Sequence, residues 1–482
     1  MSKRDWVPSE DSEAVFGIMK GGLTVFRKKS LLALTVVLML MVSLLIVPGA
    51  SSQVGAQTPL PGRAIPQFVD PLPSLYTIVD NGTQITLEMT EFQSMVMPST
   101  WAAANPTYQG TWVWGYRVPG QSSADPYIGP VIVATRGNPT EIKFVNNLGN
   151  TSTSHVLAYT QSTDQTLHWA DPLYGEANTG THEAMMNPGM PPMSPWDQHY
   201  AGPIPAVPHL HGGEVPPVLD GGPDAWFLSQ SPDTTAYPDA EMHGHGYYSK
   251  DGNITANYAI YRYPNSQEAA LLWFHDHTLG ATRLNVYAGL AGAYLLVDPA
   301  LSLPANLPGP ADIVPLVIQD RMFDTNGQLY FPNIGINPEH PYWVPEFVGD
   351  TIVVNGKVWP FKNVEQKRYR FLFLNGSNAR AYELFLVDPV TKMFGPPMWV
   401  IGTDGGYLDT PVKLDPALGQ KLVIMPGERY DVIIDFADNT NNPTPSGSYI
   451  LRNTARAPFP FGAPPAGATI GRIVKFVLTP PV

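Results

Sequence analysis

The sequence predicts an all-β protein with two antiparallel sandwich or barrel domains. Pro (51) and Gly (43) are abundant, aromatic residues reach 11%, and charged residues make up only 14%. This composition is typical of short strands joined by many turns. Apolar and polar residues alternate with a period of two in many segments, and no long amphipathic helical pattern occurs. A chain of 482 residues is long enough for two or three domains, each with its own core.

Residues 1–57 are expected to form a signal peptide or a membrane anchor. A basic segment at 27–29 precedes an apolar run at 31–47, and small residues follow at 54–56. This order is typical of an export signal. Because the apolar run is close to the shortest length that spans a bilayer, an uncleaved anchor remains an alternative. We therefore expect the protein to be exported and extracytoplasmic, either secreted or anchored to the membrane.

The first β domain is expected over residues 66–298. Its clearest strand patterns lie at 83–92, 130–133, 141–145 and 293–297. Each alternates apolar with polar residues or forms a short apolar run between turn residues. The long, polar and proline-rich stretch 160–206 is expected to be a loop.

A proline-rich linker, 299–311, separates this domain from a second β domain over 312–482. The second series of strand patterns lies at 313–319, 351–354, 368–374, 429–436, 449–452 and 471–478. The two series together predict the two-domain architecture.

Two His-x-His pairs carry the strongest functional signal, His209 with His211 and His275 with His277. In a strand, side chains at positions i and i+2 point to the same face, so each pair presents two imidazoles together. Neutral imidazole is a common metal ligand. Chance gives about 0.25 such pairs in this composition, and a loop or core histidine explains any one of them. Two pairs beside Gly or aromatic residues favour a metal site.

Two weaker features also suggest metal binding. A third pair, His243 with His245, lies in a polar, Gly-rich stretch without packing partners. Thioethers favour Cu(I), so a methionine-rich loop could collect copper. This loop contains Met185, Met186, Met190 and Met193, between His182 and His199. A flexible surface loop is the simpler interpretation of both features.

Composition excludes several classes of function. The net charge of −13 and the pI near 5.2 argue against a nucleic-acid partner. The sequence contains no cysteine, which excludes disulfides, thiolate catalysis and cysteine-ligated metals within these residues.

Several segments resemble the multicopper oxidase family, and most nearly its branch of spore-coat laccases and bilirubin oxidases. They are HLHGG (209–213), DAWF (224–227), WFHDHTLGATRLNVYAGLAGAYLL (273–296), VNGKVWP (354–360), RYRFLFLNGSN (368–378), GTDGG (402–406) and PGERYDVIIDF (426–436). They follow the family order from about residue 66 to the C-terminus. The resemblance implies two cupredoxin-like Greek-key β-barrel domains and a copper cofactor.

The resemblance also implies roles for individual residues. His209 matches the ligand of the type 2 copper, whereas His211, His275 and His277 match ligands of the type 3 copper pair. Such a cluster reduces O₂ to water with electrons from a small reducing substrate. Asp220 matches an acidic residue near the oxygen channel and is a candidate proton donor. A turn aspartate beside Gly221 is the alternative.

The sequence departs from the family in one respect. A third domain supplies half of the histidines of the family's three-copper cluster, together with a blue copper bound by cysteine. Here only His340 follows His277, and cysteine is absent. We therefore expect domains one and two only, with the third domain absent and the chain inactive by itself.

Two other functions remain open, namely an exported copper-binding protein and a cell-envelope interaction protein without turnover. The presence of all four ligands argues against a purely structural role. The sequence leaves the reducing substrate open between a phenol, a tetrapyrrole and a metal ion.

Overall fold

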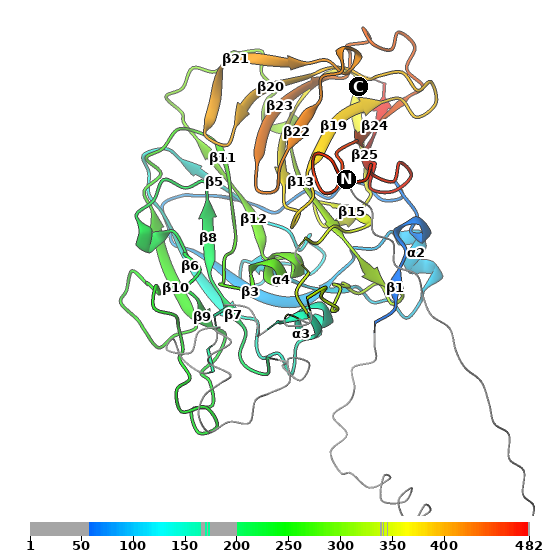
Figure 1. Ribbon diagram of the computed structural model, residues 1–482. Coiled ribbons are helices and arrows are strands. Elements are labelled where there is room, and N and C mark those ends of the chain that lie inside the picture. The colour runs from blue at the N-terminus through cyan, green and yellow to red at the C-terminus, as the bar shows by residue number, and fades with distance from the viewer. Residues whose placement is uncertain are drawn as a thin grey trace, which may run out of the picture. The chain divides into compact units, whose positions relative to one another are not determined.

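Strands make up nearly all of the regular structure (Figure 1). The computed structural model describes residues 57–164, 169–170, 172–173, 200–337, 340, 342–344 and 346–480. The expected signal or anchor, apart from residue 57, and the methionine-rich loop lie outside these residues. Within the described ranges, no helix has both the length and the apolar character that crossing a bilayer requires. The expected all-β class is confirmed.

Two sheets form the first β region. A four-stranded sheet has the order β10-β6-β3-β4, and a five-stranded sheet has the order β2-β5-β12-β11-β8. The strands are β2 Thr77–Val79, β3 Ile85–Ser94, β4 Thr111–Arg117, β5 Val131–Thr135, β6 Thr140–Asn147, β8 Pro208–His211, β10 Tyr258–Tyr263, β11 Leu271–Asp276 and β12 Ala291–Val297. Strand pairs β3–β6, β5–β12 and β2–β5 are parallel. The expected antiparallel sheets are therefore mixed sheets, because alternation fixes the buried face of a strand and not the direction of its neighbour.

Two further sheets form the second β region. Their orders are β16-β15-β13-β18-β23-β20-β21 and β17-β25-β24-β19-β22. The strands are β13 Ile313–Arg321, β15 Thr351–Val354, β16 Lys357–Val358, β17 Phe361–Glu365, β18 Arg368–Asn375, β19 Tyr382–Val387, β20 Met398–Thr403, β21 Gly406–Leu414, β22 Leu422–Ile424, β23 Arg429–Asp435, β24 Ser448–Asn453 and β25 Arg472–Thr479. The strands of the two regions therefore divide between residues 297 and 313.

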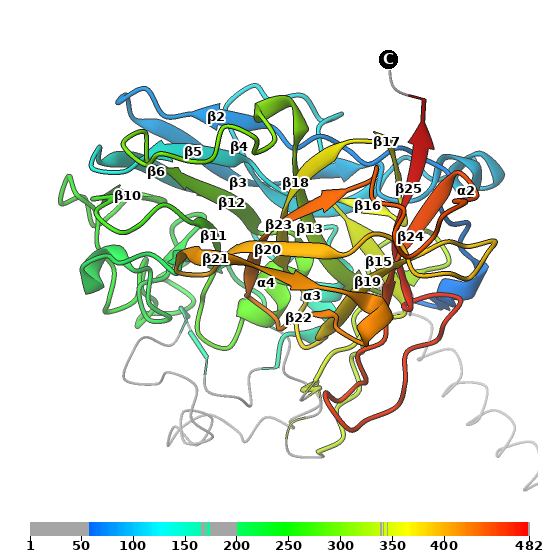
Figure 2. The ribbon, with the colours of Figure 1, turned by 90° about the horizontal axis from the view of Figure 1, so that it is seen from above.

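Contacts join the two regions within the unit Gln57–Val482. Figure 2 shows the sheets of the first region beside β18, β20 and β23 of the second. Strand β11 contacts β23 directly. The N-terminal strand β1 Pro59–Leu60 pairs with β14 Phe323–Asp324 of the second region. The end of β11, where the pair His275 and His277 lies, is therefore next to the second β region.

The remaining elements are short. They are helices α2 Ser99–Ala104, α3 Leu157–Ser162 and α4 Thr282–Ala288, strands β7 Pro205–Ala206 and β9 Phe227–Leu228, and 3₁₀ turns η1 Gly62–Ala64, η5 Pro217–Leu219, η6 Pro310–Asp312 and η7 Pro416–Leu418. Part of α3 and all of β7 lie in the stretch 160–206, so the expected loop was wrong at both ends. A helix of fewer than two turns shows too little periodicity to be predicted from sequence.

Two glycines allow close packing, one against β11 and the other at the end of α4. Gly292 lies opposite Phe274, and a Cβ at Gly292 would be 2.3 Å from the Phe274 ring. Helix α4 ends at Gly289, which has a φ of 134°. A Cβ there would be 2.1 Å from the carbonyl oxygen of Trp114. Any side chain at either position would displace the strand or the helix that lies beside the histidines.

Candidate metal centre

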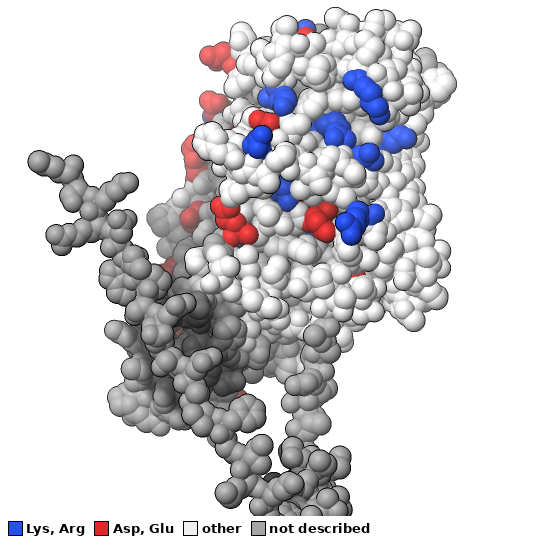
Figure 3. Space-filling view, turned by 45° about the vertical axis from the view of Figure 1, so that its right-hand side comes forward, with Lys and Arg blue, Asp and Glu red and all other residues white. Residues whose placement is uncertain are grey.

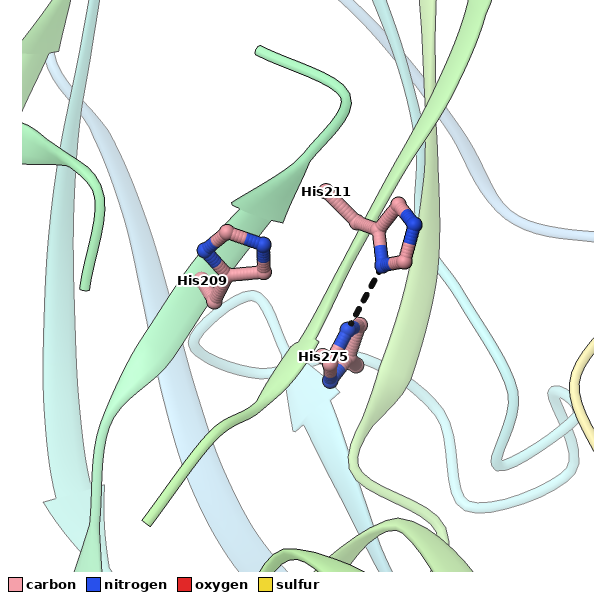
Figure 4. Close-up of side chains that lie close together, drawn as sticks. All are labelled: His209, His211 and His275. Atoms are coloured by element: carbon pink, nitrogen blue, oxygen red, sulfur yellow. Dashed lines mark hydrogen bonds between the residues drawn. The ribbon is translucent and has the colours of Figure 1, made fainter. Parts of the chain in front are cut away.

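Strands β8 and β11 bring the two His-x-His pairs together. They pair antiparallel, with His209 opposite His275 and His211 opposite Trp273. Figure 4 shows the imidazoles of His209, His211 and His275 converging from the two strands. Each of these three residues offers one ring nitrogen as a metal ligand, and the three nitrogens lie within 4.8 Å of one another. The ring of His277 lies 5.0 Å from that of His209, so the structure brings all four predicted ligands together.

Backbone carbonyls determine which nitrogen of two imidazoles is free. Nδ1 of His209 donates to the carbonyl oxygen of Asp220 over 2.6 Å. Nδ1 of His275 donates to the carbonyl oxygen of Asp276 over 2.7 Å. Because a carbonyl only accepts, the proton lies on Nδ1 in both rings, and Nε2 keeps its lone pair. A carbonyl of this kind orients a ligating histidine and makes it more basic.

The other two imidazoles have nitrogens that suit a metal ion. Nδ1 of His211 faces Nε2 of His275 at 3.1 Å, along the dashed line in Figure 4. Nδ1 of His277 is buried and has no hydrogen-bond partner among the described residues. Buried polar nitrogens rarely lack a partner. Several imidazole nitrogens lie close together, and one of them has no hydrogen-bond partner among the described residues. Such a set of nitrogens suits a copper ion.

Burial favours the neutral form of the imidazoles of His209, His211 and His275. It lowers the pKa of His211 to about 4, and the positive charge of Arg429 adds to this effect. Burial also holds the pKa of His275 well below its ordinary value and lowers that of His209. Metal ions bind the neutral ring, because protonation removes the lone pair. These three rings can therefore bind a metal at neutral pH without first losing a proton.

Asp276 fixes the strand end between His275 and His277. Its fully buried carboxylate accepts hydrogen bonds from the backbone N–H of Val207 (2.9 Å) and from the N–H and hydroxyl of Thr278 (3.0 and 2.9 Å). Burial raises the pKa of this carboxyl to about 6, against the effect of these hydrogen bonds. The carboxylate of Asp276 thus ties the end of β11 to Val207 and to the turn at Thr278.

Asp220 lies beside the cluster, as the sequence predicted. Its carbonyl orients His209, and its partly exposed carboxylate lies 3.5 Å from Nδ1 of the same ring. Gly221 follows with a φ of +70°, and a Cβ there would be 1.9 Å from the carbonyl oxygen of Pro208. The turn that sequence analysis gave as the alternative is therefore present. The role of proton donor stays a prediction.

The cluster lines an open cleft of about 440 Å³ between the two β regions. The four histidines and Trp273 form one side of it. The other lining residues are Thr282, Arg283, Val286, Ser377, Asn378, Pro426 and Gly427. A Cβ on Gly427 would be 3.0 Å from Cε1 of His211, so the second β region closes directly on that ring. The sequence did not indicate that this glycine belongs to the site, although it lies in the family-like segment 426–436.

Arg429 holds the loop of Gly427 against β11. Its Nε donates to the carbonyl oxygen of Leu271 over 2.9 Å, and its Nη1 donates to that of Gly427 over 3.0 Å. Nη1 also lies 2.9 Å from the carboxylate of Asp404, and the side chain is only 2% exposed. A single guanidinium thereby connects the strand of His275 to the loop beside His211.

The third histidine pair lies outside this cluster. The ring of His243 stacks on Tyr247 at 4.7 Å with an interplanar angle of 18°. His243 also forms an isolated bridge with Phe227. These contacts give His243 a packing role.

The fold and the four converging imidazoles define a copper-binding protein of the cupredoxin type. Residues 333–469 match the multicopper oxidase family. The chain is 34% identical to a laccase of Bacillus subtilis over 420 residues, which cover 86% of this chain and 66% of that protein. It is 38% identical over 294 residues to multicopper oxidase LPR1 homolog 1 of Oryza sativa, covering 59% and 44%. The chain belongs to the multicopper oxidase family.

Solved structures agree with this fold. The McoA multicopper oxidase of Aquifex aeolicus matches with a TM-score of 0.52 and 23% identity, covering 86% of this chain and 66% of that one. A multicopper oxidase of Campylobacter jejuni, described as a metallo-oxidase, matches with a TM-score of 0.52 and 19% identity, covering 89% and 65%. This chain thus spans just under two thirds of these two structures and 66% or less of the two relatives. The expected family, fold class and copper cofactor are confirmed.

Proposed function

We propose that this chain supplies four ligands of the copper cluster of a laccase-like oxidoreductase. Such an enzyme couples the oxidation of a small reducing substrate to the reduction of O₂. The observation that carries the proposal is the convergence of His209, His211, His275 and His277 on one cleft, with two rings held by carbonyls. The match to laccases supports the reaction class.

The bound copper would supply electron transfer to O₂, while the residues of this chain bind and orient it. The backbone of Asp220 and Asp276 holds two rings, and Gly427 leaves room for His211. Turnover in this family also needs a thiolate-bound copper, and these 482 residues contain no cysteine. We therefore infer that further polypeptide contributes that thiolate and the other imidazoles at the open cleft.

Copper binding to the full-length chain tests the proposal. We expect isothermal titration of the metal-free protein with Cu(II) to show binding that His275→Ala weakens by at least about 10-fold, because a ligand is lost. His155→Ala is the matched control, since the His155 side chain is 58% exposed and pairs with Glu91 away from the cluster. Equal copper affinity in the wild type and in His275→Ala would contradict the proposal.

A copper-binding protein without turnover is the second candidate, and the absence of cysteine favours it for the chain by itself. The discriminating measurement is O₂ consumption by the copper-loaded full-length chain with a phenol, a tetrapyrrole or a reduced metal ion as donor. We expect no catalysed consumption from this chain alone. Sustained turnover with any donor would show that the four-histidine site is sufficient.

We also propose that residues 1–57 direct export and that 31–47 can anchor the protein to the membrane. The apolar run behind a basic segment supports this proposal. Cell fractionation of a tagged chain, with and without residues 1–57, provides the test. We expect the intact chain outside the cytoplasm and the shortened chain inside it. An identical distribution of both would contradict the proposal.

A further inference from the structure

A pair of arginines lies on the outer face of a sheet in the second β region, away from the copper cleft. Arg452 on β24 pairs with Arg472 on β25 and, on its other side, with Phe385 on β19. Residues directly opposite each other in a sheet share a face, with Cβ atoms about 5 Å apart. All three side chains are partly exposed. Two guanidinium groups and an aromatic ring therefore lie side by side at the surface.

Arg452 lacks an acidic partner. Within the described parts of the chain, its guanidinium forms no ion pair and no hydrogen bond. Burial and the positive charge of Arg472 lower its pKa, and no carboxylate offsets them. Glu383, which shares this face of β19, is bound by Thr454 (2.9 Å) and Lys421 (3.4 Å) instead.

Arg472 is held in place by neutral groups. Its Nη1 donates to Oε1 of Gln67 over 3.2 Å, and Nε2 of Gln67 donates to the carbonyl oxygen of Ala468 over 2.7 Å. Trp359 donates its indole N–H to the carbonyl oxygen of Arg472 over 2.9 Å. The guanidinium is thus oriented without any negative charge against it.

The loop beside Arg452 approaches its guanidinium with glycine backbone and no side chain. A Cβ on Gly467 would be 3.4 Å from Nη2 of Arg452, and one on Gly471 would be 3.3 Å away. A hydrogen bond of 2.9 Å from the N–H of Gly471 to the carbonyl of Ala466 closes this loop. The two glycines bring the backbone close to the arginine without a side chain that would block access.

Like charges placed directly opposite each other destabilise a sheet, so this arrangement calls for a compensating anion. Guanidinium groups present planar sets of N–H donors that match the oxygens of phosphate and carboxylate. We propose that Arg452 and Arg472 form an oxyanion-binding site on the outer face of the second β region. Phe385 gives this site an apolar wall, which suits an aromatic carboxylate better than inorganic phosphate. Lys and Arg side chains gather on the upper part of the face that Figure 3 shows.

Calorimetric titration of the metal-free, full-length chain with inorganic phosphate and with benzoate tests the site, with chloride at matched ionic strength as reference. We expect saturable binding of at least one of the two oxyanions. Arg452→Gln should weaken it by about 10-fold or more, because charge-assisted hydrogen bonds are lost. Arg368→Gln is the control, since Arg368 is an exposed arginine paired with Asp435 on the other sheet. If benzoate binds more tightly than phosphate and Phe385→Ala abolishes this difference, the ligand is an aromatic carboxylate. If both anions bind equally tightly, the site takes a simple oxyanion.

Thermal unfolding shows whether each variant is still folded and whether the anion stabilises it. Without added anion, Arg452→Gln should unfold at the same temperature as the wild type or higher, because a like-charge contact is removed. Phosphate or benzoate should raise the unfolding temperature of the wild type and of Arg368→Gln, and not that of Arg452→Gln. Absence of binding, or an equal rise in all three proteins, would overturn the proposal. Because no copper is present, the result does not depend on the function proposed for the histidine cluster.

Discussion

The carbonyl oxygen of Asp220 determines how the ring of His209 faces the cluster, and a glycine makes this contact possible. Gly221 lies where a Cβ would be 1.9 Å from the carbonyl oxygen of Pro208. We predict that Gly221→Ala displaces the turn and lowers copper affinity by about 10-fold. Gly82→Ala is the matched control, because Gly82 also has a positive φ (+83°) but open space around it. Equal losses of copper affinity in the two variants would contradict a specific role for this turn.

A second prediction at the residue scale concerns Asp388. Burial opposes ionisation of its carboxyl, yet hydrogen bonds from Ser446, Thr391 and Val390 outweigh burial and hold its pKa well below the usual range. A depressed folded-state pKa gives stability that is present above the unfolded pKa of about 3.9 and is lost as pH falls toward the folded value. Asp388→Asn should therefore cost about 1–3 kcal/mol at pH 6 and less at pH 3. Urea unfolding at both pH values measures this, and an equal cost at both would contradict it.

Sequence could identify the four candidate ligands but not the groups that orient their rings. The i, i+2 spacing predicted that each pair presents its imidazoles together. The structure brings all four rings to one cleft, although β11 ends at Asp276, before His277. The carbonyl of Asp220 and the glycine at 427 reach the rings through the folded chain, and neither leaves a periodic signal in the sequence. Contacts of this kind depend on backbone approach, which residue type indicates only through glycine.

At the scale of the elements, Arg429 holds β11 and the loop before β23 together. Its guanidinium donates to the carbonyls of Leu271 and Gly427 and lies 2.9 Å from Asp404. We predict that Arg429→Gln lowers the free energy of unfolding by about 2–3 kcal/mol, because buried carbonyls lose charged donors. Arg136→Gln, which removes an exposed pair with Asp298, should cost less than about 1 kcal/mol. Denaturant unfolding compares the two variants, and similar costs would contradict the proposed role of Arg429.

The positions of the strands were easier to predict than which strands pair and in which direction. Alternation located segments such as 313–319 and 368–374, which the structure shows as β13 and β18. These two strands pair in parallel, and no local pattern indicates that, because pairing depends on the path of the chain between strands. Helices α3 and α4 were missed because each is too short for a helical period to stand out.

In the whole molecule, the cluster lies at an open cleft between two β regions, and the chain spans 66% of one laccase relative. The expected domain boundaries, 66–298 and 312–482, remain predictions, although the strands divide at the segment between them. The family, the all-β fold and the copper cofactor followed from the sequence, because the motifs are specific. The cleft between the two β regions could not be predicted, because its walls come from segments far apart in the sequence that only the folded chain brings together.

X-ray absorption at the copper edge of the copper-loaded, full-length chain tests the central claim most directly. The arrangement of His209, His211, His275 and His277 predicts a first coordination shell of nitrogen and oxygen without sulfur, because the thiolate is absent and the rings supply the donors. Replacing the four histidines by alanine should abolish this signal. A sulfur shell, which would place the copper on methionines, or an unchanged spectrum in the fourfold variant would contradict the claim that these imidazoles form the copper site.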